Sequence, residues 1–384
     1  MNKITIPQPS WHSDITAIIL ELEKLRTKKL HSVLPAHIFF QIKDIFQILE
    51  TLGSARIEGN RTTLSEYVEK LLEGEAKTDE DQKEVTNLNK GIKFVEENTD
   101  ENTTINRIYL SELHKIVTHE LTPPPKGEGS KRPGYLRNHN VKITQAEHLP
   151  PDLSVLQEYF DNFIDFVNFD HPAQDQLLMI AIAHHRFAFM HPFDNGNGRV
   201  GRLLNYALLI KHGFKVKTGR IINPSSVFYS DRGKYYEMLS QADSLSQTDT
   251  LVWAEYFLLG LKNEIEKIDS LLDPKFIKNK ILHPTLKFAL EKENISSREQ
   301  MILKYLVNKS DLSMKTAELS NLNISDSSVQ KSRIMAKLRE KNIIKPIQPG
   351  GRIYTINFVN SYLLRGVMRS LEQEGFISDF LNKI

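Results

Sequence analysis

The sequence predicts a mainly α-helical protein with one β-hairpin in its central region and a small unit of helices and strands at its C-terminal end. Apolar residues recur at spacings of three and four along most of the chain, which is the period of helices with one buried face. Alternation of apolar and polar residues, which is typical of half-buried strands, is scarce. A chain of 384 residues can form two or three domains, each with its own core.

The N-terminal region, residues 1–105, contains two apolar stripes with helical spacing. They comprise Ile15, Ile18, Ile19, Leu22 and Leu25, and then Ile38, Ile42, Ile45, Phe46 and Leu49. The second stripe predicts a helix over about residues 38–60. Gly59 and Asn60 are expected to end this helix, because both residue types adopt the left-handed conformation that terminates helices.

The central region, residues 106–270, contains the predicted hairpin and a third helical stripe. Residues 136–143 alternate, follow the breaker-rich segment 123–129 and precede two consecutive prolines, so we expect a β-hairpin that projects from a helical body. The third stripe, between Leu177 and Ala188, runs directly into a loop that begins at His191.

The C-terminal region, residues 271–384, begins where Asp-Pro and His-Pro pairs interrupt the helical pattern. We expect three helices, with caps at Ser296 (with Glu299), and at Ser325 or Asp326, and then two strands around a glycine turn. The helices are expected over 297–307, 316–322 and 327–341, and the strands over 343–345 and 352–356. This order is typical of a winged helix-turn-helix domain followed by a C-terminal helix.

The composition excludes several classes of protein and site. The chain has no cysteine, which excludes disulfides, thiolate metal sites and a cysteine nucleophile. The formal net charge of +2 offers no global attraction to nucleic acid, so DNA binding would need a local basic patch. We see neither a signal peptide nor an apolar run of membrane-spanning length, and we expect a cytoplasmic protein without membrane association.

The loop that begins at His191 combines groups that suit phosphate chemistry. Its sequence is His-Pro-Phe-Asp-Asn-Gly-Asn-Gly-Arg, and a helix is expected to follow. Gly196 and Gly198 let the backbone turn sharply and approach a ligand, and the start of a helix presents N–H groups and a positive dipole end to an anion. Arg199 and Arg202 lie three residues apart, so both can face the same polyanion.

Three side chains of this loop suit acid–base or metal chemistry. His191 is the natural general base near neutral pH. Asp194 and Asn195 carry the hard oxygen atoms that Mg²⁺ prefers. A His-Pro turn or a Gly-Asn-Gly turn alone is more often structural, so the interpretation depends on the whole string.

The string resembles the motif of the Fic family, H-P-F-x-D/E-G-N-G/K-R-x-x-R. Every fixed position agrees except the acidic one, where this chain has Asn195, and the resemblance extends over roughly residues 50–265. Fic domains are small helical bundles that typically transfer AMP from ATP to a Ser, Thr or Tyr hydroxyl of a protein. The resemblance implies that residues 106–270 are the Fic core.

The resemblance implies a role for each part of the loop. His191 would deprotonate the target hydroxyl, which then attacks the α-phosphate of ATP. Arg199 would contact the β-phosphate and Arg202 the γ-phosphate, while Asn195 or the adjacent Asp194 would hold Mg²⁺. The nucleotide-binding residues that it implies are Asn195, Gly196, Asn197, Gly198, Arg199, Arg202, Tyr235, Tyr236, Ile143 and Thr144.

Two further segments receive roles from the same resemblance. Tyr235 and Tyr236 would cover the adenosine moiety, and the alternative is that they are ordinary aromatic core. The predicted hairpin would be the flap on which the target protein, or a second part of the enzyme itself, is aligned by strand addition. Ile143 and Thr144 would then lie close to the nucleotide.

The segment 54–60, Ser-Ala-Arg-Ile-Glu-Gly-Asn, resembles a second Fic-family signature, S/T-x-x-x-E-G/N. By this resemblance Glu58 would pair with Arg202 and deny it to the γ-phosphate, and Ser54 would steady the helix. ATP would then bind unproductively, and the enzyme would be autoinhibited. The alternative is an ordinary capped helix end.

The departure at Asn195 leaves three outcomes open: an AMP transferase with altered metal binding, a transferase of another nucleotide or phosphoryl group, or a nucleotide-binding domain with little activity. The same site could also remove AMP, with Glu58 positioning water.

A rival interpretation is a DNA-binding regulator whose Fic core only senses nucleotide. The third helix of the C-terminal region carries the basic residues Lys331, Arg333, Lys337, Arg339 and Lys341, although winged helices also serve in dimerisation and protein docking.

Overall fold

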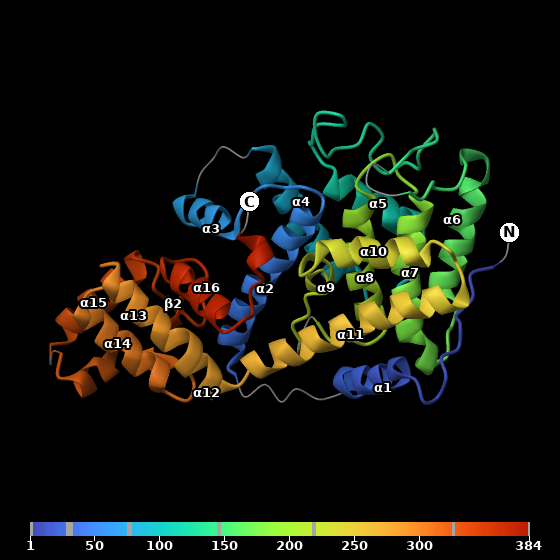
Figure 1. The fold of residues 1–384 in the computed structure, drawn as a ribbon. Coiled ribbons are helices and arrows are strands. Elements are labelled where there is room, and N and C mark those ends of the chain that lie inside the picture. Colours follow the sequence, from blue (N-terminus) through green and yellow to red (C-terminus); the bar gives the residue numbers. More distant parts are fainter. Residues whose placement is uncertain are drawn as a thin grey trace. The chain divides into compact units, whose positions relative to one another are not determined.

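The computed structural model describes residues 3–27, 34–74, 79–143, 147–216, 220–324 and 327–382, and they are mainly helical (Figure 1), as predicted. The chain divides into two compact units. One comprises Met1–Leu30, Glu50–Thr62 and Lys77–Glu266, and the other comprises His31–Leu49, Thr63–Ala76 and Lys267–Ile384. Helix α2 (Ala36–Ile57) therefore contributes its first part to the second unit and its last part to the first unit.

The first unit is a helical bundle around helix α8. Every residue of α8 is buried except Gly198 and Lys211, which is typical of a helix at the centre of a domain. Helices α4, α5 and α7 pack against α8, and α6 packs against α7. Besides the end of α2, the helices of this unit are α1 (Asp14–Thr27), α4 (Glu80–Asn98), α5 (Arg107–Val117), α6 (Leu153–Asn168), η1 (Ala173–Asp175), α7 (Gln176–Met190), α8 (Asn197–Lys211), α9 (Ser226–Tyr229), α10 (Arg232–Ala242) and most of α11 (Gln247–Leu271).

The second unit contains a small antiparallel sheet in the order β1-β3-β2, in which Tyr354 lies opposite Met314 on one side and Pro346 on the other. Ser296 and Glu299 form the predicted capping box at the start of α14. The elements of this unit beyond α2 are α3 (Leu64–Glu73), α12 (Pro274–Phe276), a π-helical segment η2 (Ile277–Leu282), α13 (His283–Glu291), α14 (Ser297–Asn308), β1 (Ser313–Lys315), η3 (Thr316–Leu322), α15 (Ser328–Glu340), β2 (Ile344–Pro346), β3 (Ile353–Ile356), α16 (Leu363–Gln373) and η4 (Asp379–Leu381).

The helices and the two strands predicted after residue 296 are present, and β1 is an additional strand that was not predicted. Ser327 caps α15, and the predicted caps Ser325 and Asp326 lie outside the described residues. The winged-helix interpretation of this unit and the predicted division into three domains stay predictions.

The prediction of a β-hairpin at residues 136–143 is wrong for the conformation seen here, since this segment forms an irregular loop without an assigned strand. Arg137 explains the difference, because its groups bond to the neighbouring loop instead of a partner strand. Its backbone N–H donates to Pro192 O at 2.9 Å, and its side-chain Nε donates to His191 O at 3.0 Å. Its guanidinium also donates to Pro151 O. Thr144 lies outside the described residues.

In the described ranges, every helix is either too short or too polar to cross a bilayer.

Candidate active site

The loop between α7 and α8 has a tightly fixed backbone. Helix α7 ends at His191, which has a left-handed φ of 47°, and α8 begins after Gly196, which has a φ of 74°. Between them, the side chain of Asn197 bonds both backbone groups of Phe193: Oδ1 accepts from its N–H at 2.9 Å and Nδ2 donates to its carbonyl at 3.0 Å. Asn197 therefore shapes the loop from within. A left-handed residue other than glycine is uncommon, and such strain is characteristic of functional sites.

His114 of α5 holds this loop through ring stacking and two hydrogen bonds. Its ring stacks on Phe193 with centroids 3.9 Å apart and an interplanar angle of 6°. Its Nδ1 accepts from Gly134 N at 2.8 Å, which leaves Nε2 to donate to Asn195 O at 3.0 Å. Burial lowers the pKa of His114 to about 4, so the ring is neutral at pH 7. This residue was not predicted, because a single histidine in an amphipathic helix carries no distinctive sequence pattern.

Asp194 uses its carboxylate to hold the preceding part of the chain. Its Oδ1 accepts from Ser130 Oγ at 2.6 Å and from Asn195 N at 3.0 Å, and its Oδ2 accepts from Lys131 N at 3.0 Å. Both oxygens that were predicted to take over metal binding are thus engaged in bonds that order the loop.

Asn195 is similarly engaged. Its Oδ1 accepts from Gly196 N at 2.8 Å, and its Nδ2 donates to Glu128 Oε2 and to Gly129 O, both at 3.2 Å. Among the described residues, no cluster of three or more His, Cys, Asp or Glu side chains could hold a metal ion. The side chains in this conformation do not fit a preformed Mg²⁺ site, and magnesium binding stays a prediction.

The start of α8 is occupied by a carboxylate of the chain itself. A Cβ atom placed on Gly198 would lie 2.0 Å from Oε1 of Glu58, so this oxygen rests directly on the first turn of the helix. The same oxygen accepts from an Arg202 guanidinium nitrogen at 2.7 Å. Ser54 completes the contact, because its Oγ accepts from Arg202 Nε at 2.8 Å and its carbonyl from the guanidinium at 3.0 Å. The predicted pair of Glu58 and Arg202 is therefore formed.

Electrostatics keep this pair charged and His191 neutral. Burial opposes ionisation of Glu58, but Arg202 and Arg199 outweigh it and hold its pKa below the ordinary value. Burial lowers the pKa of His191 to about 4, although the charge of Glu58 opposes this shift. The imidazole of His191 is thus in the form that can accept a proton. It lies a few residues before the start of α8, where the helix N–H groups favour an anion and the Glu58 carboxylate is bound.

Residues 104–209 match the Fic/DOC family. The chain carries a Fic/DOC domain.

Curated relatives with the name protein adenylyltransferase Fic share moderate identity with half of this chain. The relative from Nematostella vectensis is 29% identical over 197 residues, and the one from Drosophila melanogaster is 27% identical over 198 residues. Each alignment covers 50% of this chain but only 42% and 36% of the respective relative. The chain thus spans less than half the length of these relatives.

Solved structures agree with the fold. A Fic family protein from Desulfovibrio desulfuricans has a TM-score of 0.56 and 19% identity, and the match covers 92% of this chain and 98% of that one. Fic-1 from C. elegans has a TM-score of 0.52 and 20% identity, covering 68% of this chain and 73% of that one. At these identities the likeness shows the fold alone.

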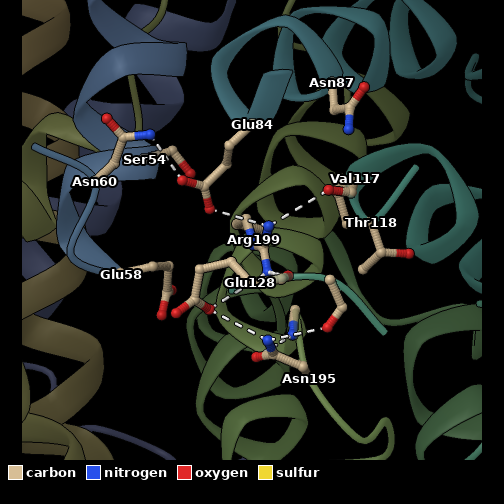
Figure 2. A network of polar contacts seen from close by, with 12 residues as sticks. Ser54, Glu58, Asn60, Glu84, Asn87, Val117, Thr118, Glu128, Asn195 and Arg199 are labelled. Carbon is tan, nitrogen blue, oxygen red and sulfur yellow. Dashed lines mark hydrogen bonds and ion pairs between the residues drawn. The ribbon is translucent and has the colours of Figure 1, made fainter. Parts of the chain in front are cut away.

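Arg199 of the Fic domain is held inside the bundle, which the sequence did not predict. Its side chain is fully buried, with a relative exposure of 0%. Figure 2 shows it between the carboxylate of Glu84, which forms an ion pair at 3.0 Å, and the backbone carbonyls of Val117 and Glu128, to which it donates. The guanidinium is thus engaged by protein groups at the position predicted to meet a β-phosphate.

The Tyr235 side chain lies in the aromatic core of the first unit. It is 3% exposed, and its hydroxyl bonds to His184 Nε2 at 2.9 Å. His184, in turn, accepts from Asn205 Nδ2 through Nδ1 at 2.9 Å, so this buried histidine has both ring nitrogens hydrogen-bonded inside the core. For Tyr235 this environment favours the structural alternative.

Tyr236 lies nearer the surface of the site. It is partly exposed, its hydroxyl donates to Ile57 O at 3.4 Å, and Arg232 lies over its ring at 5.5 Å. It therefore contacts the helix that carries Glu58. Ile143 is partly exposed and belongs to the irregular segment described above. Nucleotide contacts by these residues stay predictions.

Proposed function

We propose that this Fic domain is a protein adenylyltransferase, which transfers AMP from ATP to a Ser, Thr or Tyr hydroxyl of a protein, and that Glu58 restrains it. The observation that supports this most directly is the carboxylate of Glu58 on the first turn of α8, paired with Arg202. An anion-binding site at a helix start, filled by an internal anion, suits a phosphate ligand that must compete for entry. The adenylyltransferase name of the curated relatives agrees with this assignment.

The chemistry needs little beyond positioning and charge. The target hydroxyl gives its proton to the neutral imidazole of His191, and its oxygen forms a bond to the α-phosphorus of ATP. The bond between that phosphorus and the oxygen bridging to the β-phosphate breaks, and pyrophosphate leaves. The N–H groups at the start of α8 stabilise the negative charge that develops on the transferred phosphate. The same chemistry modifies the enzyme itself where one of its own hydroxyls reaches the site.

Glu58 restrains the reaction through direct competition. Its carboxylate and a triphosphate both need Arg202, and two anions held against one buried guanidinium repel each other at close range. Glu58 retains 26% exposure of its side chain while Arg202 retains 2%, so the carboxylate is the partner that can swing out. Displacing it exposes the cationic site to the γ-phosphate.

The first prediction concerns this restraint. Glu58→Gly is expected to raise self-modification by about tenfold, which corresponds to about 1.4 kcal/mol of competing binding energy. The measurement is label transfer from ATP labelled at the α-phosphate, with purified protein and with lysate. The matched controls are His191→Ala in the Glu58→Gly background, which should transfer no label, and ATP labelled at the γ-phosphate.

Each labelling result discriminates between functions. Transfer of the α-label supports the proposal, and transfer of the γ-label instead identifies a phosphoryl transferase. Equal labelling by the wild-type and Glu58→Gly proteins would rule out the restraint. Loss of label from a modified target on adding wild-type enzyme would show that the site removes AMP.

A second candidate function rests on α15, where Arg333, Lys337 and Arg339 are exposed on one short helix. Such a basic face would suit DNA phosphates, and the Fic domain would then act as a nucleotide sensor. Binding of the full chain to a DNA duplex that weakens steeply with salt, without label transfer by Glu58→Gly, would favour this function.

A further inference from the structure

The side chain of Arg199 is enclosed by protein groups in this structure. One guanidinium nitrogen contacts Glu84 and Val117 O, the other donates to Glu128 O, and Nε is buried without a hydrogen-bond partner among the described residues. These contacts come from α4, from the end of α5 and from the loop after α5. A guanidinium that joins three segments fixes the start of α8 relative to them, which is a positioning role.

Among the partners of Arg199, Glu84 matters most, because it also bonds to Asn60. Its side chain is 2% exposed, and one oxygen forms the ion pair with Arg199. The other oxygen, Oε2, accepts from Asn60 Nδ2 at 2.8 Å, as Figure 2 shows. Losing Arg199 would leave the buried Glu84 carboxylate without its counter-charge, and losing Asn60 would leave Oε2 without its hydrogen-bond donor, so the three side chains depend on one another.

Asn60 follows Glu58 by two residues and ties the end of α2 to α4. Besides Glu84, its Nδ2 donates to Asp81 O at 2.9 Å, and its Oδ1 accepts from Thr62 N at 3.0 Å. The next backbone N–H, that of Arg61, donates to the Asp81 carboxylate at 3.2 Å. The turn that ends the restraining helix is thereby fastened to the first turns of α4.

We infer that Glu84 is a positioning residue that links the segment carrying Glu58 to the nucleotide loop, with Asn60 on one side and Arg199 on the other. Release of Glu58 and loosening of the loop are then coupled: a change that frees Asn60 from Glu84 also weakens the hold on Arg199. The inference rests on the proposed function for its effect on activity, but the link itself has a structural readout.

The test uses Asn60→Ser in the full chain. A serine hydroxyl can still accept from Thr62 N and keep the turn, but it is too short to reach Glu84. Asn98→Ser is the matched control, because Asn98 is an exposed asparagine at the end of α4 whose side chain donates to Phe94 O of the same helix. Hydrogen exchange followed by mass spectrometry reports on residues 54–60 and, separately, on residues 196–203.

In Asn60→Ser, exchange should accelerate in both segments by about tenfold, the factor that one hydrogen bond to a charged group is worth. The control should change neither. Faster exchange confined to residues 59–62 and 79–84 would overturn the link, since the effect would then be local. Should Asn60→Ser fail to fold, Glu84→Gln provides the same two-segment comparison with the side-chain shape retained.

Activity adds a second, independent readout. Asn60→Ser should raise α-label transfer in the wild-type background and lower it in the Glu58→Gly background, because the restraint is already absent there and only the loosening of the nucleotide loop remains. An equal increase in both backgrounds would contradict the link. If Glu58→Gly itself transfers no label, the proposed function fails, while the exchange experiment still decides the inference about Glu84.

Discussion

At the scale of single residues, the site depends on side chains that are neutral or charged because of their surroundings. His191 and His114 are both held neutral by burial, but they serve different purposes. His191 lies at the end of α7 with a left-handed backbone, while both ring nitrogens of His114 form hydrogen bonds with backbone groups of Asn195 and Gly134. One is placed to accept a proton, and the other holds the loop that places it.

The His114 interpretation predicts a stability effect. His114→Phe keeps a ring that can stack on Phe193 but loses the two hydrogen bonds to Gly134 N and Asn195 O. We expect the free energy of unfolding to fall by about 2 to 3 kcal/mol, since two buried backbone groups lose their partner. Urea denaturation measures this, with exposed His119→Phe as the control. A change equal to that of the control would show that the two bonds are not needed.

The residue scale also shows what a sequence can and cannot predict about the site. The His191 loop and the Glu58 segment could be recognised because their residues are consecutive in the chain. Glu84 could not, because a glutamate in a polar helix most often faces solvent. Its burial against Arg199 depends on where α4 and α8 meet, which is a property of the folded bundle.

At the scale of elements, the start of α8 is the part of the fold that links structure to chemistry. It is a helix terminus with exposed N–H groups, opened by a left-handed glycine, and the end of α2 delivers Glu58 to it. The helices could be predicted from their period, whereas the irregular loop at residues 136–143 could not. Alternation alone says nothing of Arg137, whose bonds to Pro192 and His191 replace a partner strand.

Gly198 provides a test at this scale. Gly198→Ala is expected to push the Glu58 carboxylate off the helix, because its Cβ would lie 2.0 Å from Oε1. Because the displaced atom is the end of a flexible side chain, the cost should lie at the lower end of the range for overpacking, about 1 kcal/mol, which thermal or urea unfolding can measure. In the Glu58→Gly background the same substitution should cost little. An equal cost in both backgrounds would mean that the penalty comes from α8 itself and not from the carboxylate.

At the scale of the whole molecule, buried titratable groups tie stability to pH. Burial lowers the pKa of several histidines well below 6.5: His114, His191 and His212 to about 4, and His184 to about 3. Between these values and 6.5 the unfolded chain binds protons that the folded chain does not. Glu50 acts in the opposite sense, because burial raises its pKa to about 7.

We therefore expect stability to be retained above about pH 6.5 and to fall as the pH decreases toward 4. Each fully buried histidine, such as His114 or His184, lowers the free energy of unfolding by about 1 to 2 kcal/mol between pH 7 and pH 5. Glu50 raises it over the same interval by about as much as one histidine lowers it. Urea denaturation at the two pH values measures the sum. Glu50→Gln should steepen the loss over this interval, and a shallower loss in that variant would refute the assignment.

The contact between Glu58 and Gly198 also constrains how such a chain can change over generations. While the carboxylate occupies this place, a side chain at position 198 has to displace it, so a substitution there weakens the restraint as well as the packing. A lineage that first loses Glu58 gains a vacant position 198 and can fill it. Once it is filled, the carboxylate has nowhere to return to, so the order of the two substitutions decides whether the loss of restraint is reversible.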